Sequence, residues 1–157
     1  MKFLRTVSLD VSDEKVFPLA AKSDEWALTG TFAFVDSVPE DLSKKERLAF
    51  RNGWLGTNSF GRATFALIKE ISNEQYELVV LRLGEHIYKH YGAPNLIIAT
   101  EAARREVEFA ASLCEHPVGT MLSIEREFTD DGISERFHVV QKNQSNEHAK
   151  IWSIVKD

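Results

Sequence analysis

One stretch of this chain, residues 50–61, restricts the fold more than any other. It contains Gly53, Gly56 and Gly61, three of the eight glycines in the chain, together with Trp54, and it has neither proline nor an acidic residue. A helix pattern precedes it and a strand pattern follows it. We therefore predict a corner, with Gly53 left-handed just past a helix end and Trp54 packing back on the last helical turn.

The glycines of this corner do not form a phosphate-binding loop of the usual kind. Such a loop follows a strand, opens a helix and contains Gly-Lys-Ser/Thr. Here the helix comes first, and the stretch contains no lysine. Two interpretations remain. The stretch is only an architectural corner, or it borders a pocket in which Asn58, Ser59 and Arg62 contact a small anion.

Alternating apolar residues predict strands at residues 3–9, 26–35 and 60–71. Inside the second of these, Gly30 predicts a bulge or a close approach of another backbone. The helix before the corner is predicted from a capping box, in which Ser43 and Glu46 each bond the backbone of the other.

Two longer helices are expected, from Asn73 to about Tyr91 and from Thr100 to about Cys114, with Asn73 and Thr100 as their caps. The first is apolar on two opposite sides. Its second stripe consists of Leu78, Leu81 and Tyr88. A helix of this kind is either sandwiched inside the fold, which we expect, or packed on a partner.

Residues 121–128 and 133–140 are expected to form a β-hairpin, because the Asp131-Gly132 pair between them is a strong turn signal. The pairs expected to face each other are Ile124 with Val139, Glu127 with Arg136, and Glu125 with His138. This register gathers apolar groups on one face and opposite charges on the other. The apolar tail could add a last strand or dock on a neighbouring chain. It contains Ile151, Trp152, Ile154 and Val155.

These elements predict a single α+β domain over residues 1–140, with an antiparallel sheet of about five or six strands and three helices, two of them packed on one face. Residues 141–157 are expected to be a polar linker and an apolar tail. The net charge of -5 argues against nucleic-acid binding. The chain has no apolar run long enough for a membrane span or a signal peptide, and one cysteine, so we expect a cytoplasmic protein.

Three features could carry chemistry, and each has a structural alternative. Cys114 with His116 could be a nucleophile and its base, but Cys114 falls on an apolar helix face, where a thiol is inert. His86 and His90 have the i, i+4 spacing of two metal ligands, or they are a half-buried pair. Glu106 lies within an apolar arc, so it has a structural partner or acts as an acid beside Trp54.

The candidate ligand-binding set therefore consists of Trp54, Asn58, Ser59, Arg62, Glu106 and His116. We expect no catalytic residue and no cofactor, and only a weak metal site at His86 and His90.

Four segments resemble an uncharacterised family of small proteobacterial proteins that has no established activity. They are residues 31–34, 49–56, 59–61 and 109–120. The resemblance covers about residues 1–140. It implies a bacterial, soluble, single-domain protein, and it carries over no catalytic residue.

Two hypotheses follow. The first is a non-enzymatic cytoplasmic accessory or binding module that forms a homodimer, or binds a protein partner, through the second helix or the C-terminal tail. The second is a small-molecule-binding protein, for an anionic ligand, or a minor enzyme, with a pocket beside the Trp54 corner.

Overall fold

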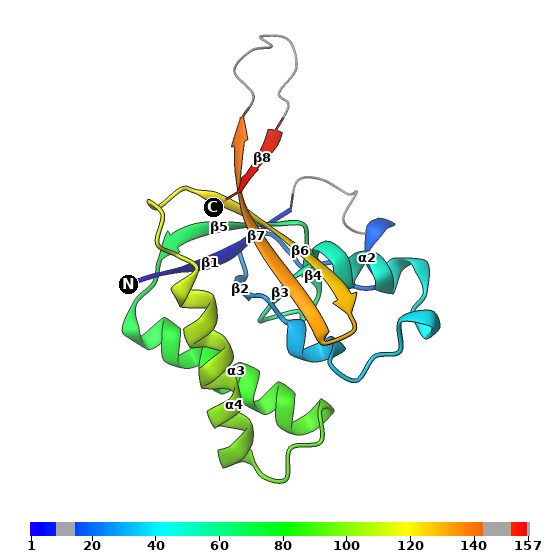
Figure 1. Ribbon diagram of the computed structural model, residues 1–157. Helices are drawn as coiled ribbons and strands as arrows, with labels where there is room; N and C mark the ends of the chain where they lie inside the picture. Colours follow the sequence, from blue (N-terminus) through cyan, green and yellow to red (C-terminus); the bar gives the residue numbers. More distant parts are fainter. Residues whose placement is uncertain (9–14, 143–151, 157) are drawn as a thin grey trace.

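The computed structural model describes residues 1–8, 15–142 and 152–156, and it has the expected α+β fold (Figure 1). The strands are β1 (Lys2–Val7), β2 (Trp26–Leu28), β3 (Trp54–Gly56), β4 (Arg62–Ala63), β5 (Phe65–Glu70), β6 (Met121–Thr129), β7 (Gly132–Lys142) and β8 (Trp152–Lys156). They form one antiparallel sheet in the order β4-β3-β2-β1-β5-β6-β7-β8. The predicted number of strands, about five or six, was too low. Seven strands precede residue 143, and two of these, β3 and β4, are too short for an alternating pattern to reveal.

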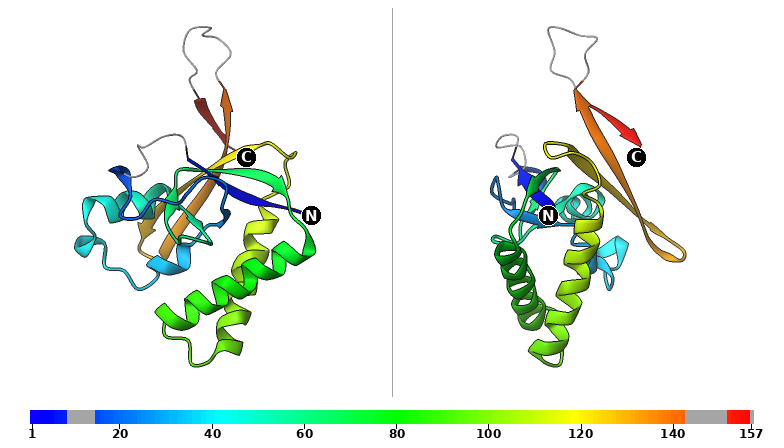
Figure 2. Two further views of the ribbon diagram at one scale, coloured as in Figure 1. Left: turned by 180° about the vertical axis from the view of Figure 1, so that it is seen from behind. Right: turned by 90° about the vertical axis from the view of Figure 1, so that its left-hand side faces the viewer.

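The three expected helices are α2 (Lys44–Asn52), α3 (Asn73–His90) and α4 (Leu96–Ser112). Helices α3 and α4 lie side by side and cover one face of the sheet, whereas α2 packs against β6 (Figures 1 and 2). The core lies between the sheet and the α3–α4 pair. Its largest fully buried side chain is Trp54, and Phe3, Leu83 and Val107 are also fully buried there.

The strand predicted over residues 60–71 is bent at Thr64, and its two parts occupy different positions in the sheet. Its first part, β4, pairs with β3, and its second part, β5, pairs with β1. Strands β3 and β1 are separated by β2, so the sheet must curl until the β4 edge meets the start of β5. The corner at residues 50–61 is thus where the chain leaves α2 and closes this curl.

The strand predicted over residues 26–35 was wrong beyond Leu28. Gly30 is left-handed, with φ of 69°, and the 3-10 turn η1 (Thr31–Phe34) follows it. Gly30 is closely approached, but by side chains rather than by the predicted backbone, because an added Cβ would lie 2.5 Å from Leu55 Cβ and 2.7 Å from Arg62 Nη1. Tertiary packing therefore overrides a regular β pattern here.

The capping box of α2 is confirmed. The Glu46 amide donates to Ser43 Oγ at 3.1 Å, and the Ser43 amide donates to Glu46 Oε1 at 3.0 Å. The left-handed helix stop predicted at Gly53 was wrong, because Gly53 is extended (φ -93°, ψ 127°) and Trp54 continues directly into β3. Glycine is needed for space, since a Cβ would lie 2.7 Å from the Ala49 carbonyl oxygen.

The predicted caps of the two long helices were wrong, because each helix is capped by a residue earlier in the chain. Ser72, not Asn73, caps α3, in a second capping box with Gln75. Asn95 caps α4, while Thr100 lies inside that helix and donates to the Leu96 carbonyl. A serine directly before an asparagine offers two acceptors, and only the reciprocal bond to Gln75 decides between them.

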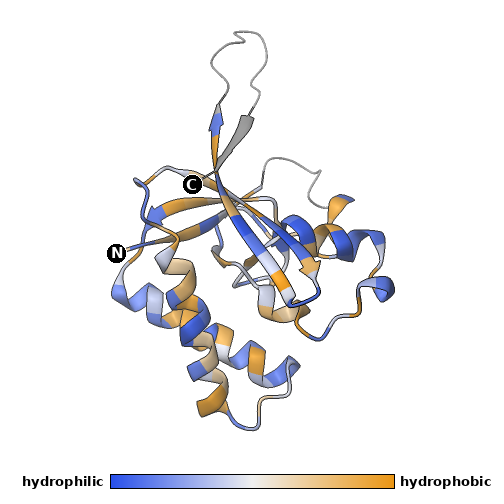
Figure 3. Ribbon diagram, viewed as in Figure 1, coloured by the Kyte–Doolittle hydropathy of each residue, from blue (hydrophilic) through white to orange (hydrophobic). Residues whose placement is uncertain are grey.

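The sandwiched position expected for α3 was wrong. Its second apolar stripe is exposed, at 50% for Leu78, 53% for Leu81 and 47% for Tyr88. The first turn of α4 is also apolar and exposed, so the free end of the helix pair carries an apolar surface (Figure 3). It contains Leu96, Ile97 and Ile98.

The β6–β7 hairpin is present, but the predicted register was wrong by two residues. The turn residues are Asp130 and Asp131, so Thr129 faces Gly132, and Glu125 faces Arg136. A shift of two residues keeps every side chain on its face, which is why the other register also looked consistent. Of the two roles expected for the tail, strand pairing is observed for β8, which joins β7; Ile151 lies outside the described residues.

Candidate ligand-binding sites around two buried arginines

Arg126 is a fully buried cation whose hydrogen bonds are all satisfied. It is 1% exposed and projects from β6. Its bonds are Nε to Thr31 Oγ1 (2.7 Å), Nη1 to the carbonyls of Phe50 (2.6 Å) and Ala49 (3.5 Å), and Nη2 to the carbonyls of Thr29 and Gly53 (3.0 Å). A guanidinium has five N–H donors, and here each has an acceptor. Arg126 therefore has a structural role: it joins β6 to the end of α2 and to the turn after β2.

Arg62 is also buried but is less completely hydrogen-bonded. It is 7% exposed and belongs to β4. Nη1 donates to the carbonyls of Thr29 and Gly53, each at 3.2 Å, and Nη2 donates to the Gly30 carbonyl at 3.0 Å. Nε and one N–H of Nη2 have no acceptor among the described residues. The two arginines thus differ in one respect that matters for ligands, which is the number of spare donors.

Their electrostatic surroundings differ as well. Arg126 Nε lies 3.8 Å from the Glu135 carboxylate, whereas no carboxylate of the described residues forms an ion pair with Arg62. Burial, with the charge of Arg126 as a second cause, lowers the pKa of Arg62 to about 9, so it remains a cation at neutral pH. The ring of Phe34 lies 4.8 Å from the Arg62 guanidinium carbon. A buried cation without a counter-ion is costly, so Arg62 would gain from an anion.

Arg62 lines two adjoining cavities beside the corner, which together we call the Tyr91 groove. The first, of about 540 Å³, is lined by Leu19, Leu55, Ser59, Phe60, Arg62, His86, His90 and Tyr91. The second, of about 630 Å³, shares Leu19, Phe60, Arg62 and Tyr91 with it and extends to Phe34 and the start of α2. These volumes are in the range of small-molecule sites.

Aromatic rings form the walls of the Tyr91 groove. Phe60 and His86 are stacked, with ring centroids 3.6 Å apart and planes 2° apart. Burial, assisted by the neighbouring His90, lowers the pKa of His86 to about 4. His86 is therefore a neutral, flat side chain at physiological pH, and it suits stacking better than charge pairing.

The residues predicted for ligand binding are only partly brought together. Ser59 and Arg62 line the Tyr91 groove, beside the weak metal candidates His86 and His90, and Asn58 lines a neighbouring cavity of about 420 Å³ that shares these two histidines. The other three predicted residues, Trp54, Glu106 and His116, line none of the cavities described here.

The backbone amides of the corner do bind an anion, but it is the protein's own Glu25. Its Oε1 accepts from the amides of Asn58 (2.9 Å) and Ser59 (2.7 Å), and its Oε2 accepts from Ser59 Oγ (2.7 Å) and the Lys22 amide (2.6 Å). Glu25 is only 3% exposed. Sequence reasoning missed this partner, because nothing local links residue 25 to the corner.

Of the remaining candidates, Cys114 favours its structural alternative. Cys114 is buried, and burial raises the pKa of its thiol to about 11. His116 accepts a bond from Lys2 Nζ at its backbone carbonyl. Glu106 is half-buried on α4, and burial together with the charge of Glu135 raises its pKa. In the described part of the chain, His86 and His90 gain no third ligand from a His, Cys, Asp or Glu.

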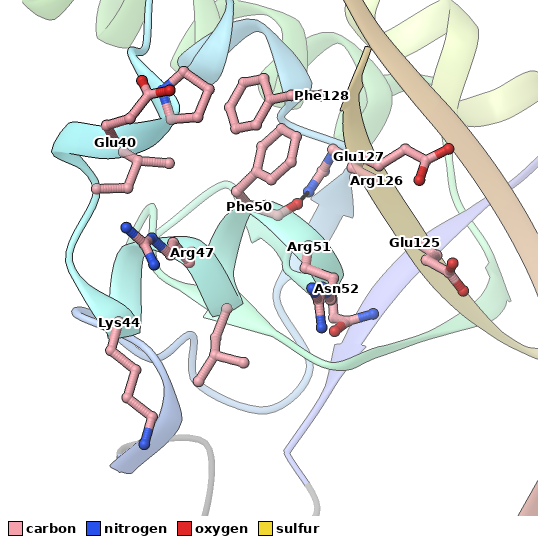
Figure 4. Close-up of a pocket in the computed structure, with 13 residues that line it drawn as sticks. Glu40, Lys44, Arg47, Phe50, Arg51, Asn52, Glu125, Arg126, Glu127 and Phe128 are labelled. Carbon is pink, nitrogen blue, oxygen red and sulfur yellow. Dashed lines mark hydrogen bonds between the residues drawn. The ribbon is translucent and has the colours of Figure 1, made fainter.

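A larger cavity lies on the other side of α2 (Figure 4). We call it the α2–β6 cleft, and its volume is about 920 Å³. It is lined by Lys44, Arg47, Leu48, Phe50, Arg51 and Asn52 of α2, by residues 125–128 of β6, and by Pro39, Glu40 and Leu42. The rings of Phe50 and Phe128 stack at 3.9 Å, and Arg126 lies behind them (Figure 4).

The fold and these cavities define the class: an α+β protein with a curled antiparallel sheet and with open cavities on both sides of α2. The chain belongs to the family of unknown function DUF6505, whose model matches residues 1–156 and so extends past residue 140. No curated protein and no solved structure matches it. Within the described residues, no helix is long and apolar enough to cross a membrane.

Proposed function

We propose that this protein is a non-enzymatic binding module of the bacterial cytoplasm, and that it binds a small organic anion in the Tyr91 groove. One observation carries the proposal. Arg62 is a buried cation with spare N–H donors and without a carboxylate partner among the described residues, and it lines an open groove. The cytoplasmic location is supported by a single, buried thiol.

The chemistry of Arg62 favours a carboxylate. Nε and Nη2 lie on the same edge of the guanidinium, the edge that binds a carboxylate through two parallel hydrogen bonds. Three carbonyl contacts already hold the group in place, so little side-chain entropy would be lost on binding. A charge-assisted pair with so deeply buried a guanidinium is stronger than one at the surface.

The walls of the groove favour a ligand with a flat or apolar body. Phe60 and Tyr91 supply ring surfaces, and His86 is neutral at physiological pH because its pKa is about 4. The same pKa makes His86 a poor general base at pH 7, which supports binding without catalysis. An aromatic or branched carboxylate meets both requirements.

A thermal-shift and calorimetric screen tests this function. Benzoate and phenylacetate represent the expected class, their neutral amides have the same shape, and inorganic phosphate has charge without a flat body. We expect the carboxylates to raise the melting temperature and the amides to have little effect. If amides and acids acted equally, the anion-binding function would be wrong.

Variants of two tyrosines locate the site. Tyr91 lines the groove, while Tyr88, on α3, lines no described cavity; they are 45% and 47% exposed. We expect Tyr91→Ala to weaken carboxylate binding at least about tenfold, from the loss of ring contact, and Tyr88→Ala to leave it unchanged. Arg62→Lys, which keeps the charge but loses the two-donor edge, should also weaken it. Equal binding by Tyr91→Ala and Tyr88→Ala would place the ligand elsewhere.

The second candidate function is an accessory protein that acts as a homodimer. The exposed stripe of α3 favours it, because Leu78, Leu81 and Tyr88, at positions i, i+3 and i+10, lie on one face of the helix, as residues of a helix–helix seam do. Mass measurement in solution tests it, with Leu81→Asp compared with Val38→Asp, an equally exposed position on another part of the chain. We expect Leu81→Asp alone to give a monomer. A wild-type monomer would remove this candidate, and truncation before β8 tests the tail in the same way.

A further inference from the structure

The α2–β6 cleft has one wall of unpaired positive charge. Lys44, Arg47 and Arg51 follow the i, i+3, i+7 pattern, so they form one stripe along α2. All three are exposed, and none forms an ion pair with another described residue. The protein as a whole carries a net charge of -5, so this stripe is a local exception to its overall charge.

The carboxylates of the facing wall form ion pairs with a neighbouring strand and not with the stripe. Glu125 and Glu127 project from β6, and both carboxylates are engaged by Arg136 of β7, at 3.5 Å and 3.7 Å. Figure 4 shows these carboxylates pointing away from α2. The cations of α2 are therefore left to face an open cavity of about 920 Å³.

We propose that the α2–β6 cleft binds an extended acidic segment of a partner protein. The stripe from Lys44 to Arg51 is about 10 Å long, which is the length of about three residues of extended chain. Arg47 and Arg51 are about 6 Å apart along the helix, and acidic residues two positions apart on an extended chain are spaced by about 7 Å. An acid-x-acid pattern thus matches the stripe.

The cleft also has a place for an apolar side chain between the acids. Leu42 and Leu48 are half-buried at its surface, and Phe128 stacks on the buried Phe50 beneath. An apolar residue of the partner would cover these groups while its acidic neighbours reach Arg47 and Arg51. Affinity then comes from burial of apolar surface as well as from charge attraction.

A protein segment fits the cleft better than a nucleic acid does. The apolar groups that line it, Leu42, Leu48 and Phe128, suit the apolar side chain of a peptide, which a phosphate backbone lacks. Because the protein carries a net charge of -5, a polymer with one negative charge on every nucleotide meets more repulsion than a segment with an acid at every second residue.

The test uses fluorescein-labelled octapeptides and the full-length protein. One peptide has glutamates at alternate positions around a central phenylalanine, a second has glutamine in place of every glutamate, and a third probe is an eight-nucleotide single-stranded DNA. We expect the acidic peptide to bind, more weakly as salt rises, and the glutamine peptide to bind at least about tenfold more weakly. Absence of binding by the acidic peptide, or equal binding by the glutamine peptide or the DNA, would overturn the proposal.

Charge reversal on α2 locates the contact. Arg47→Glu and Arg51→Glu should each weaken acidic-peptide binding at least about tenfold. Lys45→Glu makes the same charge change on the same helix, but Lys45 lines the opposite cavity, so its effect should stay below about threefold. An equal loss in Lys45→Glu would show non-specific attraction and refute the site. Tyr91→Ala should leave peptide binding intact, so this proposal and the one for the Tyr91 groove fail separately.

Discussion

Arg62 and Arg126 donate hydrogen bonds to the same two carbonyl oxygens, those of Thr29 and Gly53. The two arginines come from strands β4 and β6, which lie at distant positions in the sheet order. Their shared acceptors belong to the turn after β2 and to the end of α2. This arrangement holds the curled part of the sheet, the turn and α2 together. Every N–H group of Arg126 has an acceptor, whereas Arg62 has N–H groups without an acceptor among the described residues.

Replacing Arg126 should destabilise the fold strongly. Arg126→Met removes five hydrogen bonds of a buried cation, four to buried carbonyls and one to Thr31 Oγ1, so we expect a loss of about 3 kcal/mol or more in the free energy of unfolding. Arg136→Met, at a side chain 49% exposed, should cost less than about 1 kcal/mol. Urea denaturation measures both. Similar losses for the two variants would contradict a structural role for Arg126.

Two glycines with nearly the same positive φ should respond differently to alanine. Gly30 and Gly92 have φ of 69° and 70°, so both substitutions carry a left-handed backbone cost of about 1 kcal/mol. Only at Gly30 does the new Cβ also overlap Leu55 and Arg62; at Gly92 it meets open space. We expect Gly30→Ala to lose at least about 3 kcal/mol and Gly92→Ala about 1 kcal/mol, by denaturant unfolding. Equal losses would show that crowding at Gly30 is relieved without cost.

The start of α3 can be tested with two adjacent substitutions. Ser72→Ala removes the acceptor of the Gln75 amide, and it should cost about 1 kcal/mol. Asn73 is the first residue inside the helix, where alanine is the better helix former, so Asn73→Ala should change stability by less than about 0.5 kcal/mol. Thermal and chemical unfolding give both values. A larger loss of stability in Asn73→Ala than in Ser72→Ala would show that Asn73 is the cap.

Acid should destabilise the protein through His86. Its pKa is about 4 in the folded protein against an ordinary value of 6.5, so the unfolded chain binds more protons between these two pH values. The contribution of neutral His86 is therefore complete above pH 6.5 and falls as the pH drops toward 4. His86→Gln, which cannot titrate, should lose less melting temperature than wild type between pH 7 and pH 5. If His86→Gln lost as much melting temperature as wild type between pH 7 and pH 5, His86 would not be the group that causes the loss.

Elements stabilised by neighbouring residues were predictable from the sequence. The capping box of Ser43 and Glu46 is a contact across three residues, and the hairpin at 121–140 follows from alternation around a turn. Its register was not predictable, because shifts of two residues preserve the faces of every side chain. The turn conformation decided it, with Gly132 at φ 131° after the two aspartates.

The candidate sites were predictable only in part, for a related reason. Ser59 and Arg62 were identified as ligand-binding candidates because they adjoin the glycine corner, and they do line the Tyr91 groove. Their partners could not be found in the same way. Glu25 accepts hydrogen bonds from the corner amides, and Tyr91 forms a wall of the groove. Both are distant from the corner in sequence and come close to it only when the sheet curls.

By itself, the sequence determined the α+β class, the three helices and the position of the corner at residues 50–61, because periodicity, capping and turn preferences act over a few residues. Only the tertiary structure decided what that corner does. It splits the following strand between two places in the sheet, and it presents the Gly53 carbonyl to two buried arginines. A charge becomes costly, and therefore available for a ligand, only once burial has removed its water, and burial is a property of the whole fold.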